Sequence, residues 1–191
     1  MHYRLNAAVH GLGGDPVGHL NRLVVSPSAQ EITHLIVHTG GLFGDERVVA
    51  VDHVEQAVSD VITLFRTVDD VGQLPVWTDV PVEGSELHHA VWSRPEGEDD
   101  ATSPPNTTSA TLSAILLREG VSVKSSDGVD VGDVETVATG SDATTITFLH
   151  VARGLMTRER HLVPISWVSR IGDDVVHPNV TQSTVIDTLT L

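Results

Sequence analysis

An internal repeat constrains the fold of this chain more than any other feature of its sequence. Gly13–Leu20 (GGDPVGHL) lies 114 positions before Asp127–Val134 (DGVDVGDV). At the same offset, and without a gap, Val9–Ile62 aligns with Val123–Val176, and 14 of the 54 aligned positions are identical. Most identical positions are glycines or alternating aliphatic residues, which two copies of one backbone would share. The sequence therefore indicates a tandem duplication.

Each copy consists of short strand patterns. In Ile32–His38 the residues alternate, with Leu35 and Val37 on one face and His34 and His38 on the other. Aromatic residues make up only 4% of the chain, so we expect a core of Val, Leu, Ile and Ala. The many Val and Thr residues favour strands over helices.

Tight turns join these strand patterns. The Asp127-Gly128 dipeptide supplies the positive φ angles that a two-residue hairpin requires. Short strands spaced by about ten residues and joined by such turns predict a small antiparallel barrel. Thr67–Val71 and Thr181–Val185 each predict one short helical turn after the last strand. We therefore predict a mainly all-β chain with two small antiparallel β-barrels in tandem.

The repeat and the local composition divide the chain into four segments. We expect a first repeat at residues 1–75, an extension that packs on the barrels at 76–93, a flexible linker at 94–110 and a second repeat at 111–191. The linker is rich in Pro, Gly, Ser, Thr and acidic residues. Because a barrel of about 60 residues is only marginally stable alone, we expect the repeats to form a pseudo-twofold pair that buries a shared face.

Charge and cysteine content exclude several functions. The net charge is −15 and there is no cysteine. Phosphate backbones and anionic lipids repel such a chain, so we expect neither nucleic-acid binding nor membrane insertion. Without cysteine there is no disulfide, no thiolate metal ligand and no Cys nucleophile. No export pattern and no apolar run of about 18 residues occur, which favours a cytoplasmic protein.

Eleven histidines raise the question of a metal site. His34 and His38 share a strand face, but residues four apart on a strand are separated by about 13 Å and cannot hold one ion alone. We interpret the histidines as surface or interface residues and expect no metal and no cofactor. Histidines that meet at an interface would weaken it below about pH 6.5, where they become charged.

The chain contains no recognisable catalytic motif. It has neither a Gly-x-Ser-x-Gly elbow nor a phosphate-binding loop that ends in Gly-Lys-Ser/Thr. The glycine clusters are therefore interpreted as hairpin glycines, and pairs of acidic residues as solvated turn residues. We predict no catalytic residues and a protein that is not an enzyme.

Tryptophan and histidine positions outline a candidate interaction surface. Trp77 and Trp92 flank the extension and either dock it on a barrel or bind a partner. Trp167 is expected to pack at the end of the second barrel, where the first copy has His53. The predicted surface consists of His34, His38, His53, Trp77, Trp92 and Trp167.

An ordered set of motifs in the second copy resembles the PRC-barrel domain. The motifs are Gly128-x2-Val131-Gly132-x-Val134, Ile146–Leu149 (ITFL), Leu162–Val168 (LVPISWV) and Asp173–Val176 (DDVV). The first copy matches more weakly, with Val49–Val54 (VAVDHV) in place of the third motif. The resemblance implies two PRC-type barrels and a role in protein–protein assembly, with no catalytic residues to transfer.

These observations predict a scaffold or adaptor that meets a protein partner or a second copy of itself. One alternative is a small-ligand or metal-binding protein that uses the histidine-rich first copy. A third possibility is an RNA-associated module, as in the ribosome maturation factor that contains a PRC barrel. The net charge of −15 argues against RNA.

Overall fold

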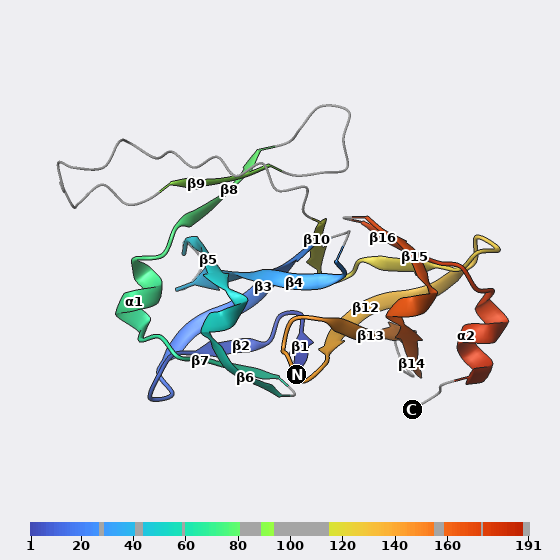
Figure 1. Ribbon diagram of the computed structural model, residues 1–191, viewed down its shortest axis with the longest axis horizontal. Coiled ribbons are helices and arrows are strands. Elements are labelled where there is room, and N and C mark those ends of the chain that lie inside the picture. Colours follow the sequence, from blue (N-terminus) through green and yellow to red (C-terminus); the bar gives the residue numbers. More distant parts are fainter. Residues whose placement is uncertain are drawn as a thin grey trace.

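The computed structural model describes residues 1–26, 29–40, 44–58, 60–80, 89–93, 115–154, 159–172 and 174–188. In these residues the fold is mainly β, with two short helices at opposite ends of the molecule (Figure 1). The predicted linker at 94–110 lies outside the described residues, as does part of the predicted extension at 76–93.

The described strands form two sheets. The first sheet has the order β6 (Val54–Val58), β7 (Val61–Leu64), β2 (Ala8–His10), β3 (Pro16–Ser26), β4 (Glu31–Thr39), β5 (Glu46–Ala50), β8 (Val76–Val80) and β9 (His89–Ser93), and β10 (Ile115–Arg118) pairs with β3. The second has the order β14 (Glu159–Pro164), β13 (Ile146–Arg153), β12 (Asp130–Thr139), β11 (Ser122–Lys124), β16 (Val175–Pro178) and β15 (Val168–Ile171), and β1 (His2–Arg4) pairs with β12.

Neither sheet closes on itself within the described residues. The second sheet ends at β14 and β15, and no ladder joins these two strands. A 3-10 turn, η2 (Ile165–Trp167), separates them and bends the chain sharply, and η1 (Val51–His53) separates β5 from β6 in the same way. The all-β class is confirmed, but the prediction of closed barrels is wrong.

The elements of the two halves occur at the 114-residue offset of the sequence repeat. The offset relates η1 to η2 and β7 to β16 residue for residue, and α1 (Val68–Gly72) to the start of α2 (Gln182–Thr188). Positions 114 apart are called equivalent below. Equivalent residues Glu31 and Thr145 form a β-bridge with each other, so a pseudo-twofold axis passes between them.

Each half donates a strand to the sheet of the other half. Strand β1 pairs with β12, with Tyr3 opposite Val137, and β10 pairs with β3, with Leu117 opposite Leu23. These two pairings are equivalent at the 114-residue offset, so the exchange is reciprocal. Figure 1 shows β1 beside the strands of the second half and β10 beside β3.

A tight turn after each exchanged strand directs the chain from one sheet to the other. The Ala7 amide donates to the Arg4 carbonyl at 3.1 Å, and Asn6 adopts a left-handed φ of 66°. At the position equivalent to Asn6, Gly120 has a φ of 82°. Asn and Gly are the residues that adopt this conformation at low cost.

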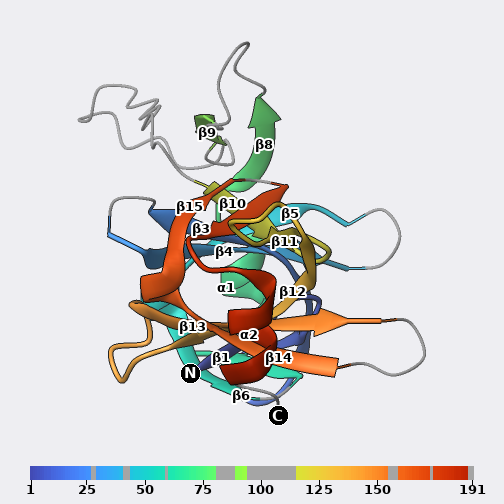
Figure 2. The same cartoon turned by 90° about the vertical axis from the view of Figure 1, so that its right-hand side faces the viewer.

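One hydrophobic cluster spans both halves. Tyr3 and Leu117, both fully buried, belong to it together with residues of all the central strands. Burial raises the pKa of Tyr3 to about 12, so its neutral hydroxyl donates to the Ala143 carbonyl at 3.1 Å. The predicted pair that buries a shared face is therefore present. Figure 2, viewed along the pair, shows strands of both halves arranged around a common centre.

Candidate functional site

Part of the outer face of the first sheet is covered by Trp77, a side chain of the strand that follows the first repeat. Five residues form a second hydrophobic cluster on this covered face, namely Val24, Ile36, Val48, Leu116 and Trp77. Strand β8 pairs with the edge of β5, with Val76 opposite Arg47, and brings Trp77 onto the cluster, where it is only 6% exposed. Trp77 thus packs within its own chain.

The equivalent face of the second sheet is open except at Ala138, which is 5% exposed, and four of its positions correspond to those that contact Trp77 in the first sheet. The open face consists of Ala138, His150, Leu162 and His2, together with the neighbouring Phe148. His2 is exposed, His150 and Leu162 are half-buried, and Phe148 is 37% exposed. In the described residues β14 pairs only with β13, so its other edge accepts no strand. Figures 1 and 2 both place β8 on the side of the molecule away from β14.

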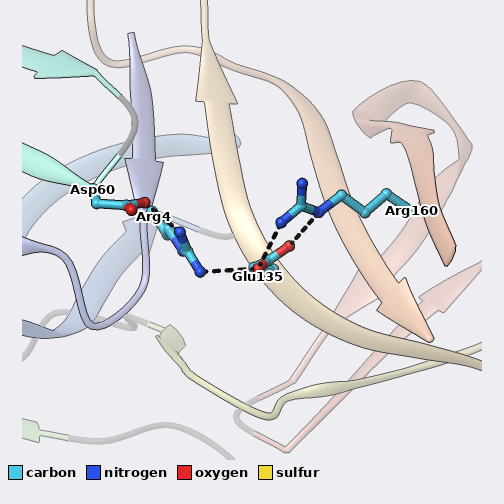
Figure 3. A network of polar contacts seen from close by, with 4 residues as sticks. All are labelled: Arg4, Asp60, Glu135 and Arg160. Carbon is cyan, nitrogen blue, oxygen red and sulfur yellow. Dashed lines mark hydrogen bonds and ion pairs between the residues drawn. The ribbon is translucent and has the colours of Figure 1, made fainter. Parts of the chain in front are cut away.

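A row of charged side chains borders the open face (Figure 3). Arg4, on the exchanged strand β1, contacts Asp60 of its own repeat and Glu135 of the second repeat, the latter at 3.2 Å. Glu135 also accepts from Arg160 Nε at 3.0 Å. Glu135 is only 13% exposed, whereas Arg160 is 49% exposed. The charge that this border presents to solvent beside β14 is therefore a guanidinium.

The equivalent border in the first repeat has different chemistry. Arg118 contacts Asp174, as Arg4 contacts Asp60. Asn21 stands where the second repeat has Glu135, and its side-chain amide donates to Glu46, the equivalent of Arg160. Both borders thus keep the Arg–Asp contact and a contact to the edge-strand residue, which is Glu46 in the first repeat and Arg160 in the second.

Two histidines meet on the open face. The rings of His2 and His150 lie 5.6 Å apart at 87°, in an edge-to-face arrangement. Burial lowers the pKa of His150, and His2 and Arg160 lower it further, while Glu135 acts in the opposite direction. In the first repeat, burial lowers the pKa of His34, while Asp52 acts in the opposite direction and His53 adds a smaller lowering.

The lowered pKa values of His150 and His34 predict that the protein loses stability in mild acid. Because the folded-state pKa lies below the unfolded value of about 6.5, the unfolded chain binds protons first. The free energy of unfolding is therefore highest above pH 6.5 and falls as pH drops through the folded-state pKa. His150→Ile and His34→Phe import the residues of the equivalent positions, and the double variant should have a flatter profile in urea unfolding between pH 5 and 8. An unchanged slope would contradict this assignment.

A buried histidine lies at the edge of β14. His161 is 1% exposed, and neither ring nitrogen has a hydrogen-bond partner in the described part of the chain; Nε2 lies 4.0 Å from Glu159 Oε2. Its equivalent, Arg47, donates from Nη1 to the Leu74 carbonyl at 2.8 Å, just before β8. The first sheet thus holds the incoming chain with a side chain whose counterpart, His161, has no hydrogen-bond partner in the described residues.

A depression of about 320 Å³ adjoins the border network. It is lined by Arg4, Leu5, Asn6, Ala7, Ala8, His19, Asp60 and Glu119. Leu5 and Glu119 are equivalent and directly follow the two exchanged strands, so the depression lies near the pseudo-twofold axis. Its arginine is already paired with Asp60. No group of three or more His, Asp or Glu side chains that could hold a metal ion occurs among the described residues.

The structure places the three predicted histidines on the first repeat. His34 and His38 flank Ile36 on the outer face of β4, and His53 lies in η1, half-buried. The Nε2 atom of His53 is 3.0 Å from Arg66 Nη2. His34 and His53 interact electrostatically, but His38 is at the other end of the strand.

The three tryptophans do not form one surface. Trp77, on β8, is buried against the outer face of the first sheet, and Trp92 is its cross-strand partner on β9, where the side chain lies outside the described residues. Trp167 lies in η2 and is half-buried, and its carbonyl accepts from the Asn179 amide at 2.7 Å. None of the residues of the open face and its border was among the predicted site residues; those missed include His2, Arg4, Phe148, His150 and Arg160. The repeat offset, extended eight residues upstream of Val9, would have paired the identical Arg4 and Arg118.

Comparison with known families concerns the second repeat. Residues 117–185 match a family described as "Uncharacterized protein conserved in bacteria (DUF2171)". The match begins within the exchanged strand β10 and ends in α2. No curated protein matches the chain. The resemblance to the PRC-barrel domain stays a prediction. None of the helices in the described residues has the length and apolar character needed to span a membrane.

Proposed function

We propose that this chain is a non-enzymatic assembly module that accepts a β-strand of a protein partner at the edge of β14. One observation carries the proposal. Ile36, Val48 and Leu116 are buried together with Trp77 of β8 in the first sheet. Their equivalents in the second sheet are half-buried (His150 and Leu162) or exposed (His2). The chain thus contains both an occupied and an open version of one strand-accepting face.

Strand addition suits the chemistry of the open face. An edge strand presents backbone N–H and C=O groups that a new strand can pair with, and these bonds give affinity without a specific sequence. Leu162, His150 and Phe148 supply the side-chain surface on which the added strand would rest. The PRC-barrel resemblance, which implies protein assembly, supports the same function. A metal-binding role lacks a gathered ligand set in the described residues.

Two exposed phenylalanines give a matched test. Phe148→Glu places a carboxylate on the open face, and Phe65→Glu makes the same change on the first repeat, where Phe65 is 55% exposed. We expect affinity purification from the native host to recover a partner with the wild type and with Phe65→Glu, but not with Phe148→Glu. Cross-links to that partner should map to Glu159–Pro164.

Equal recovery with both variants, or cross-links that avoid β14, would refute the proposed site. If the partner is a second copy of this chain, sedimentation will show a dimer that Phe148→Glu dissociates and Phe65→Glu leaves intact. A chain that remains monomeric and captures no protein would refute the assembly function itself.

A further inference from the structure

We infer that the strand accepted at β14 carries an aromatic side chain and, two residues away, a carboxylate. The inference rests on the proposed function and specifies the chemistry of the partner. It follows from the occupied face of the first sheet, from the charge at the edge of the second sheet, and from His161, whose ring nitrogens have no hydrogen-bond partner among the described residues.

The aromatic side chain of the added strand is inferred from the place of Trp77 on the first sheet. With Val76 opposite Arg47, the antiparallel register brings Trp77 opposite Glu46, on the same face as Val48. The equivalents of Glu46 and Val48 are Arg160 and Leu162. A ring at the corresponding place on an added strand would lie over Leu162 and His150 and beside the Arg160 guanidinium. Large, rigid aromatic side chains supply most of the binding energy at such anchor points.

The carboxylate follows from the local charge. Arg160 is 49% exposed, whereas its partner Glu135 is 13% exposed and lies between two arginines. The net charge of −15 would favour a basic partner, but charges beyond about 8 Å are largely screened at physiological salt. The nearby guanidinium of Arg160, rather than the net charge of the chain, therefore determines which charge the added strand should carry at this place. Side chains two apart on a strand share a face, so an acidic residue next to the aromatic one can reach Arg160.

His161 provides a place for the backbone of the incoming strand. It is 1% exposed with no hydrogen-bond partner for either ring nitrogen in the described part of the chain. Its equivalent, Arg47, donates to the carbonyl of Leu74, three residues before Trp77. A histidine N–H can donate to a carbonyl in the same way. A buried polar group without a partner costs free energy, which a bound strand would recover.

The chain supplies its own probe for this inference. The peptide LPVWTDVPV, residues 74–82, has Asp79 two positions after Trp77. Two variants of the peptide remove one feature each, Asp79→Lys and Trp77→Ala. Binding of each to the full chain would be measured by calorimetry at low salt and at 1 M salt, and the bound segment located by amide hydrogen exchange.

We expect the unmodified peptide to bind and to protect Glu159–Pro164 from exchange. Asp79→Lys in the peptide should weaken binding about fivefold at low salt, with a smaller difference at 1 M salt. Trp77→Ala in the peptide should weaken binding about tenfold or more. In the protein, Arg160→Met should remove the preference for the acidic peptide, whereas Arg170→Met, on β15, should preserve it.

The outcomes separate the inference from the proposed function. Equal affinity of the unmodified peptide and its Asp79→Lys variant, with protection at β14, would overturn the acidic preference and leave strand addition intact. No binding by any of the peptides would overturn both. Protection of Glu46–Ala50 alone would mean that the peptide replaces β8, and would also overturn both.

Discussion

Gly132→Ala is expected to lower the free energy of unfolding by about 3 kcal/mol or more. A Cβ atom on Gly132 would approach the Ala152 carbonyl oxygen closer than 3.0 Å, and the residue has a φ of 133° that L residues rarely adopt. Gly18, its equivalent, meets the His38 carbonyl oxygen in the same way. Because backbone atoms block the space, no side-chain rotation relieves the clash.

Substitutions at two further glycines separate the effect of the Cβ clash from the effect of the positive φ. Gly128→Ala meets no atom within 4 Å but has a φ of 78°, so it should cost about 1–2 kcal/mol through backbone strain alone. Gly72→Ala meets neither obstacle and should be neutral or stabilising by up to about 1 kcal/mol. Urea unfolding of these variants beside Gly132→Ala measures the order. A cost for Gly132→Ala no greater than that for Gly128→Ala would show that the close approach is unimportant.

Replacing a buried side chain of either exchanged strand by alanine is expected to destabilise both sheets together. Tyr3→Ala should cost about 3–5 kcal/mol and Leu117→Ala about 2–5 kcal/mol, because each removes a fully buried side chain from the shared core. Each residue belongs by sequence to one half and by pairing to the other. We therefore expect one cooperative unfolding transition in both variants.

Amide hydrogen exchange checks the coupling between the halves. In Tyr3→Ala, protection of the Leu35 amide in β4 and of the Leu149 amide in β13 should fall by the same factor. Leu12→Ala, at an exposed position, is the control and should change stability by less than about 0.5 kcal/mol. Loss of protection in one sheet only would contradict the reciprocal exchange.

Much of the architecture could be predicted from local patterns. The offset of 114 residues, the hairpin at Asp127-Gly128 and the helical turn after Thr67 all reflect backbone geometry that nearby residues impose. Thr67 caps that helix, and its hydroxyl accepts from the Asp70 amide at 3.2 Å. These local patterns do not predict whether a sheet closes into a barrel. Closure would require β14 and β15, the two ends of the second sheet, to pair with each other after η2, and they do not.

The candidate site could be predicted only in part. The histidine and tryptophan positions were selected by residue type, and Trp77 is buried by packing that sequence alone does not reveal. His150 belongs to the site because β1 brings His2 to it from 148 positions away in the sequence. No local sequence pattern predicts that contact. The equivalent residues of the other sheet, Leu116 and Ile36, are both apolar and belong to the cluster with Trp77.

The sequence by itself determined that the chain has two copies of one strand pattern, with glycines where a strand must turn or approach a neighbour closely. Only the tertiary structure decided which copy each terminal strand joins. Equivalent strands β1 and β10 present similar edges to either sheet, so pairing rules do not choose between the sheets. The left-handed turn at Asn6, and its equivalent at Gly120, directs each strand across the pseudo-twofold axis. That exchange brings His2 and Arg4 to the open face of the second sheet.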